Sequence, residues 1–170
     1  MPDAGVRAPG RPGLYAVYGN GDVWRRLRLH HGDDRPLYVG KSEDNLGSRD
    51  IRTHFKSGRT GQSTLRRSLA ALLRDDLHFS ARPRNPSAPA YFSNYALDPA
   101  SEEALTRWMN EYLSLAFWQR VGDVSLASVE REVLARWEPP LNTNGVRTPW
   151  SRQIREARAA MADEARAWAG

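Results

Sequence analysis

The chain has 170 residues, of which 40% are hydrophobic; this is enough for one domain with its own core but short for two. The absence of cysteine excludes disulfide scaffolds, thiol nucleophiles and cysteine zinc sites, so any bound metal must use oxygen or histidine ligands. The net charge is +5 and all basic residues except two lysines are arginine, which slightly favours a phosphate-bearing partner because guanidinium binds phosphate bidentately.

Two short predicted strands each carry a tyrosine. In residues 13–18 the side chains alternate with the period of two that is typical of a half-buried strand, and residues 36–40 form a second apolar run that ends at a glycine. Residues 23–29 lie between turn-forming residues and are interpreted as an extension of the first hairpin. In that arrangement Tyr38 returns beside Tyr15.

The middle of the chain alternates predicted helices with a proline-rich loop. Residues 46–56 are predicted as a short helix, and residues 64–74 as a clearer one with four leucines on one face. Three prolines in residues 82–89 exclude a helix or a central strand, so this segment is predicted as a surface loop. Residues 90–95 are predicted as a strand.

The second half is predicted to be mostly helical. Residues 98–101 carry helix-start signals, and a strand is expected at 117–121, a helix at 126–137 and a last helix after Pro149. Apolar residues at helical spacing predict that the helix after residue 98 buries one face: Leu105, Trp108, Met109, Tyr112 and Ala116.

Glu130 lies where helical periodicity expects an apolar residue. In a helix over 126–137 it falls near the middle of the apolar face, whereas Glu132 points the opposite way. An ionised, unpaired carboxylate in a low-dielectric environment costs several kcal/mol. We therefore expect Glu130 to face a metal, an arginine or a water-filled cleft, the alternative being a wet first helical turn that tolerates the charge.

Gly40 and Lys41 follow the second tyrosine strand. A glycine at a strand end lets backbone or substrate approach closely, and Lys41 places a compact ammonium group there in a chain that otherwise uses arginine. Both are candidate substrate-binding residues.

These residues together resemble the GIY-YIG nuclease family. Gly13-Leu14-Tyr15 and Tyr38-Val39-Gly40 are conservative versions of its two name-giving triplets, and the resemblance runs to about Asn144. It includes Arg49 and His54 on the following helical segment, and Glu130 twelve residues before Asn142 with prolines between them. The resemblance implies an α+β fold with a small, mainly antiparallel three-stranded sheet flanked by helices, here with an added C-terminal helix.

One spacing departs from the family's pattern, which places the arginine one turn before the histidine. Arg49 precedes His54 by five residues, which puts the two about 140° apart on an ideal helix. A bulged turn, or a helix that starts after Asp50, would restore the alignment. Arg52 is the rival catalytic arginine but precedes His54 by only two residues, so we favour Arg49 and keep Arg52 as a substrate-binding candidate.

The resemblance implies hydrolysis of DNA phosphodiesters with a divalent metal. Mg²⁺ or Mn²⁺ held by Glu130 would polarise the phosphate, and Arg49 would stabilise the charge of the transition state. Tyr15 is expected as the general base or the residue that positions the attacking water, although Tyr15, Tyr38 and His54 all remain candidates for the base. A phenol ordinarily has a pKa of about 10, so this role requires a nearby cation. The remaining predicted member, Asn142, would orient the phosphate or a metal-bound water.

The predicted organisation is a flexible arm over residues 1–11, a nuclease-like domain over 12–146 and a C-terminal helix over 147–170 packed on it. No apolar stretch approaches the roughly 18–20 residues needed to span a bilayer, and we expect a cytoplasmic protein. The alternative functions are a catalytically inactive DNA-binding module on the same scaffold and a protein-binding module that uses the C-terminal helix. No feature of the sequence indicates an oligomeric state or a DNA sequence preference.

Overall fold

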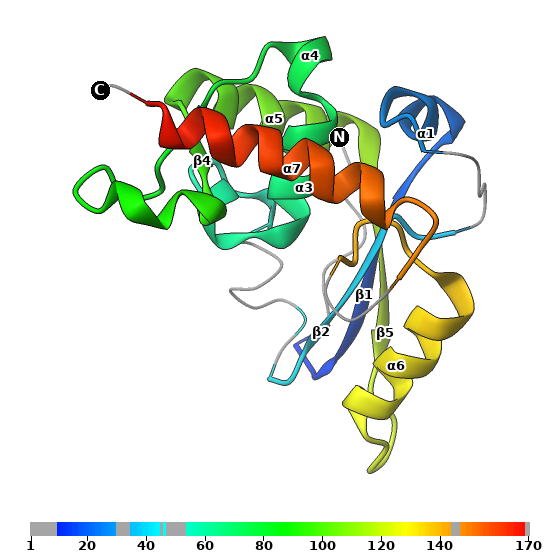
Figure 1. Ribbon diagram of the computed structural model, residues 1–170. Coiled ribbons are helices and arrows are strands. Elements are labelled where there is room, and N and C mark those ends of the chain that lie inside the picture. Colours follow the sequence, from blue (N-terminus) through cyan, green and yellow to red (C-terminus); the bar gives the residue numbers. More distant parts are fainter. Residues whose placement is uncertain (1–9, 30–34, 45, 47–53, 144–146, 169–170) are drawn as a thin grey trace.

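A three-stranded sheet and a layer of helices make up the fold (Figure 1). The structure is a computed structural model and describes residues 10–29, 35–44, 46, 54–143 and 147–168. The helices α3, α5 and α7 gather near one end of the sheet, while α6 runs alongside the strands. The predicted arm over residues 1–11 lies almost entirely outside the described residues, as does most of the predicted helix at 46–56.

The sheet is antiparallel, with β1 in the centre. Strand β1 (Gly13–Gly19) pairs with β2 (Tyr38–Ser42) on one side and with β5 (Leu113–Gln119) on the other, in the order β2-β1-β5. The register pairs Tyr15 with Gly40 and Val17 with Tyr38. This confirms the predicted α+β fold with a small antiparallel sheet, and it also confirms that Tyr38 returns beside Tyr15.

The predicted hairpin extension at residues 23–29 is wrong, because this segment begins as a helix. Helix α1 (Gly21–Arg26) starts after Asn20, whose side chain accepts a hydrogen bond from the amide of Val23 at 3.1 Å. An asparagine between glycines is typical of a hairpin turn, but here it acts as a helix N-cap. Val23 and Trp24 are buried by this helix, which explains the apolar pattern that suggested a strand.

The predicted strand at residues 90–95 is also wrong. Residues 89–94 form the 3₁₀ helix η2 (Pro89–Asn94), and the strand pairing that follows is limited to β4 (Ala96–Leu97) against β3 (Ala81–Arg82). Proline at the first position of a helix is favourable because its missing N–H has no partner there in any case. Residues 83–88 between β3 and η2 form the predicted loop.

Helix α5 (Pro99–Tyr112) runs directly into β5. Asp98 caps its N-terminus, as the start signals predicted. The helix ends at Tyr112, four residues earlier than the apolar spacing suggested, so Ala116 lies in β5 rather than on the helix. The predicted strand at 117–121 therefore begins earlier, at Leu113, and ends at Gln119.

The core lies between the sheet and the helical layer. Helix α3 (Thr64–Leu72) buries its predicted leucine face, and the short helix α4 (Arg74–Leu77) follows it. Helix α7 (Ser151–Arg166) packs across α3 through Ile154, Met161 and Ala165, while α6 (Leu126–Trp137) has the predicted bounds. Within the described part of the chain, no helix is long and apolar enough to cross a membrane.

A buried ion pair connects α3 and α5. Arg66 on α3 is fully buried and donates from Nη2 to Oε2 of Glu102 on α5 at 2.8 Å. The same carboxylate accepts hydrogen bonds from the amides of Gly58 and Thr60 and from the Thr60 hydroxyl. Arg66 also donates to the backbone carbonyl of His54 at 3.0 Å. The network therefore holds the segment 54–60 against both helices.

We expect Glu102→Ala to lower the free energy of unfolding by about 3–5 kcal/mol, because it leaves a buried guanidinium without its counter-charge. Urea unfolding measures this value. Glu103→Ala removes an exposed carboxylate one position further along the same helix and should cost no more than about 0.5 kcal/mol. A cost of Glu102→Ala below 1 kcal/mol would contradict the proposed importance of the pair.

Candidate active site

The phenol of Tyr15 lies across Gly40. The register places the two residues opposite each other, and a Cβ on Gly40 would collide with Cζ and Oη of Tyr15. The glycine that ends the second tyrosine triplet is therefore needed for the side chain of the first. Because β2 is an edge strand, the phenol crosses Gly40 toward the free edge of the sheet.

Tyr15 begins a chain of hydrogen bonds that runs through His54 to Ser63. The Tyr15 hydroxyl lies 2.6 Å from Nε2 of His54, and Nδ1 of His54 lies 2.6 Å from Oγ of Ser63. Ser63 is the N-cap of α3, where its Oγ accepts a hydrogen bond from the amide of Arg66. The start of α3 therefore determines where the imidazole lies, and the imidazole holds Tyr15. Tyr38 completes the group, with its ring centroid 6.1 Å from that of Tyr15 and 5.6 Å from that of His54.

His54 is a neutral imidazole at neutral pH. Burial, together with the positive charge of Arg66, lowers its pKa to about 4. Only 8% of the residue is exposed. A neutral imidazole has one donor and one acceptor nitrogen, so the chain has two polarities. In one, Tyr15 donates to Nε2; in the other, Ser63 donates to Nδ1 and Nε2–H donates to the Tyr15 oxygen, which is the polarity that stabilises a phenolate.

Lys41 and Glu130 meet on the other face of β2. Lys41 is the register neighbour of Leu14, and its Nζ lies 3.4 Å from Oε2 of Glu130 on α6 and 3.3 Å from Oε1 of Glu43. The hydrogen bond to Glu43 and the charge of Glu130 raise the pKa of Lys41. Glu130 is half-buried and lines a cleft together with Lys41. Its position on the apolar helix face predicted that it would face a cleft or a charged partner, and that partner is a lysine rather than an arginine.

The segment after α6 follows the free edge of β2. The amide of Leu141 donates to the carbonyl of Leu37 at 2.9 Å, and Asn142 binds both backbone groups of Val39 through its side chain. The Val39 amide donates to Oδ1 of Asn142 at 2.8 Å, and Nδ2 donates to the Val39 carbonyl at 2.7 Å. The side-chain amide of Asn142 thus makes the two hydrogen bonds that a neighbouring strand would make to Val39. The role of Asn142 as a direct contact of phosphate or metal-bound water stays a prediction.

These parts enclose a cleft of about 270 Å³ at the edge of β2. Six of the nine predicted site residues line it, and Asn142 lies on the adjoining stretch of the same edge. Arg49 and Arg52 lie outside the described residues, so both remain candidates for the catalytic arginine.

Two residues of the site were not predicted from the sequence. Gln62 lines the cleft from the 3₁₀ helix η1 (Thr60–Gln62), and Ser63 contacts His54 from the N-cap of α3. A serine just before an apolar helical stripe is a recognisable N-cap signal, so Ser63 could have been found. The full lining is Tyr15, Tyr38, Gly40, Lys41, His54, Gln62 and Glu130.

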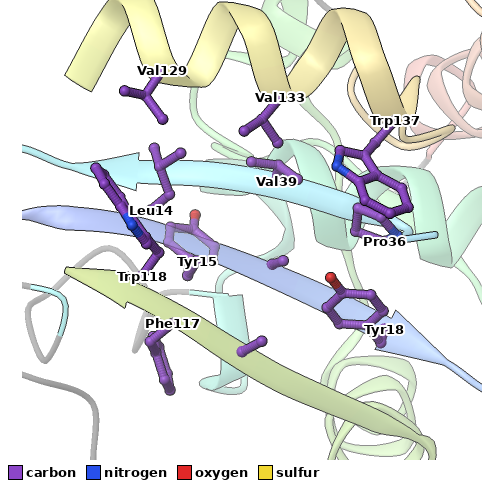
Figure 2. Close-up of a pocket in the computed structure, with 12 residues that line it drawn as sticks. Leu14, Tyr15, Tyr18, Pro36, Val39, Phe117, Trp118, Val129, Val133 and Trp137 are labelled. Carbon is purple, nitrogen blue, oxygen red and sulfur yellow. The ribbon is translucent and has the colours of Figure 1, made fainter. Parts of the chain in front are cut away.

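A second, apolar groove lies between α6 and the sheet (Figure 2). Val129, Val133 and Trp137 of α6 face Leu14, Pro36 and Val39. This packing explains how α6 is held at an angle that brings Glu130 to Lys41: the apolar residues on either side of Glu130 anchor the helix to the sheet.

The donor set at the cleft fits a hard divalent cation. Among the described residues, no group of three or more His, Asp or Glu side chains is close enough to form a metal cage. Mg²⁺ does not need one, because it commonly keeps several waters and binds through one or two carboxylates plus substrate phosphates. The Glu130 carboxylate, half-buried and facing the cleft, matches that requirement.

The GIY-YIG catalytic domain model matches residues 25–160 of the chain. The chain belongs to the GIY-YIG family. Its fold is therefore that of a nuclease catalytic domain, although the match begins after the triplet that contains Tyr15. The first triplet is placed in the site by the register of β1 against β2. Searches among curated proteins and among solved structures found no significant match.

The depressed pKa of His54 predicts a specific loss of stability in acid. The unfolded chain binds a proton at His54 with a pKa of about 6.5, whereas the folded chain does so only near 4. The stability that depends on His54 being neutral is therefore fully present above pH 6.5 and is lost as the pH falls toward 4. The free energy of unfolding should fall by about 2 kcal/mol between pH 7 and pH 5. Urea unfolding at these two pH values should show this loss in the wild type and in His78→Gln, an exposed control, but not in His54→Gln. An equal loss in His54→Gln would contradict the assignment.

Proposed function

We propose that this chain is a divalent-metal-dependent DNA endonuclease that hydrolyses phosphodiester bonds at the cleft on the edge of β2. The observation that carries the proposal is the convergence of Tyr15, His54, Lys41 and Glu130 from four separate segments on one solvent-accessible cleft. Beside the apolar groove between α6 and the sheet, a carboxylate and an ammonium group thus stand together in the cleft that also contains the Tyr15 phenol. Membership in a family of nuclease catalytic domains supports the same reaction class.

Tyr15 is proposed to accept the proton of the attacking water or to orient that water. The neutral imidazole of His54 is a poor final proton acceptor at neutral pH because of its low pKa. Its proposed role is instead to direct the Tyr15 oxygen through the 2.6 Å hydrogen bond. In the polarity in which Ser63 donates to Nδ1, Nε2–H donates to Tyr15 and supports negative charge on the phenol oxygen. Tyr38 packs on both rings and limits the orientations available to them.

Glu130 is the proposed protein ligand of Mg²⁺ or Mn²⁺. The cation would polarise the phosphate and stabilise the leaving oxygen. Lys41 holds the Glu130 carboxylate from one side and also offers an ammonium group to an incoming phosphate. Arg49 remains the proposed residue for stabilising charge on the transition state, with Arg52 as its rival.

Gly40 and Asn142 are proposed to position the site. Gly40 leaves the space that the Tyr15 phenol occupies, and Asn142 pins the β2 edge at Val39, two residues before Lys41. Each atom of the Asn142 side-chain amide uses one of its two hydrogen-bonding capacities at Val39, so Asn142 is proposed to orient the phosphate or a metal-bound water as well as to hold β2.

Replacing Glu130 should abolish metal-dependent cleavage. We expect Glu130→Ala to reduce the nicking rate of supercoiled plasmid in Mg²⁺ or Mn²⁺ by at least about 100-fold. Glu132→Ala is the matched control, since Glu132 is an exposed carboxylate on the same helix. Metal-dependent nicking that is equal in both variants would contradict the role of Glu130. If the wild type itself nicks no DNA substrate in either metal while still binding DNA, the inactive DNA-binding module is the correct reading.

The three aromatic candidates for the base are separable by single-turnover kinetics. We expect Tyr15→Phe to reduce the rate of the cleavage step by about 100-fold or more, because phenylalanine lacks the oxygen that is proposed to accept the proton of the attacking water or to orient it. His54→Gln should reduce it less, since the oxygen of Tyr15 remains. Tyr38→Phe keeps the ring packing and should be the mildest. Near-normal cleavage by Tyr15→Phe would remove Tyr15 from the proposed mechanism.

A further inference from the structure

Arg67 is a buried cation for which the described residues provide no carboxylate partner. Only 8% of the residue is exposed, yet within the described residues no Asp or Glu forms an ion pair with it. Its Nη1 donates to the carbonyls of Thr60 and Gly61, Nη2 donates to the Thr64 hydroxyl, and Nε is buried with no partner among the described groups. The neighbouring Arg66, by contrast, has the full counter-charge of Glu102. Burying a charge in this way is costly unless an anion compensates it.

Two further arginines come to the same place from distant parts of the chain. Arg84, in the loop before η2, lies with its side chain against Gly61, where an added Cβ would approach Cγ of Arg84 to 2.8 Å. Arg158, on α7, donates from Nη1 to the hydroxyl of Thr143 at 3.0 Å. Burial, and then the charges of Arg158 and Arg84, lower the pKa of Arg67 to about 10. In the part of the chain that the structure describes, neither Arg84 nor Arg158 forms an ion pair.

The arginine cluster consists of Arg67, Arg84 and Arg158. Its members contact two residues, Gly61 and Thr143, that are next in sequence to residues of the cleft or of its edge. Gly61, which contacts Arg67 and Arg84, immediately precedes the cleft residue Gln62. Thr143, which binds Arg158, immediately follows Asn142 on the β2 edge.

We propose that Arg67, Arg84 and Arg158 form a phosphate-binding site that holds the DNA backbone beside the scissile phosphate, which rests on the proposed nuclease function. Guanidinium groups suit this ligand because their planar fork matches two phosphate oxygens at once. Arg84 and Arg158 supply the accessible groups, and Arg67 supplies positive charge beneath them. The contacts are to backbone, so the site adds affinity and fixes the position of the strand without reading its sequence.

The test compares DNA affinity as a function of salt concentration. Fluorescence anisotropy with a labelled DNA duplex, in a chelator that prevents cleavage, is measured for the full chain and for the double variant Arg84→Ala/Arg158→Ala. The slope of log K against log salt is negative, and each lost phosphate contact should make it shallower by about 0.9. The double variant should therefore have a slope shallower by about 1–2 and roughly tenfold weaker affinity near 100 mM salt. Arg152→Ala/Arg155→Ala, which removes two exposed arginines from α7, is the charge-matched control, and Arg84→Lys/Arg158→Lys should recover most of the slope.

Failure of this inference is distinguishable from failure of the proposed function. If plasmid is nicked but Arg84→Ala/Arg158→Ala has the same slope and affinity as Arg152→Ala/Arg155→Ala, the phosphate site is overturned and the nuclease stands. If the slope falls as expected but no metal supports cleavage, the phosphate site stands and the catalytic proposal fails. Inorganic phosphate at constant ionic strength separates the sources of the ligand: stabilisation against heat that requires both arginines, together with an unchanged DNA slope, would identify a small-anion site and overturn the backbone assignment.

Discussion

The cleft depends on one steric constraint: the Tyr15 phenol occupies the space that any side chain at residue 40 would fill. This contact requires the antiparallel register that pairs Tyr15 with Gly40, because a shift of one residue would send the phenol to the opposite face of the sheet. The same register points Lys41 toward α6 and Tyr38 toward His54. Groups from both faces of the sheet therefore reach one cleft, because β2 is an edge strand and Gly40 has no side chain to separate them.

The helical layer supplies the second half of the site by a different physical route. Arg66 and Ser63, at the start of α3, hold the backbone and the imidazole of His54, respectively. The pair of Arg66 with Glu102 makes that support rigid, since breaking either partner would leave a buried charge unpaired. The two adjacent arginines of α3 thus differ in environment. Arg66 is neutralised within the core, whereas Arg67 carries its charge toward the flank of the cleft, beside Arg84 and Arg158.

Much of the fold was predictable because periodicity is a local property. The bounds of α6, the cap of α5 at Asp98 and the tyrosine strands follow from the spacing of apolar residues and from start signals within a few positions. The errors fall where a local pattern has two solutions. Asn20 between glycines is compatible with a hairpin turn and with a helix N-cap, and residues 90–95 are short enough to form a strand or a 3₁₀ helix after Pro89. Packing of Trp24 into the core decides the first case.

By itself, the sequence determined that a carboxylate interrupts an apolar helix face at Glu130 and that two tyrosines lie on adjacent short strands, because both statements depend on positions a few residues apart. Only the tertiary structure decided which groups meet: Ser63 at His54, Gln62 in the cleft, Asn142 on the edge of β2 and three arginines at one flank. These contacts join residues far apart in the chain, and their partners are set by strand register and helix packing. Spacing along the sequence indicates which faces are buried but does not specify these partners.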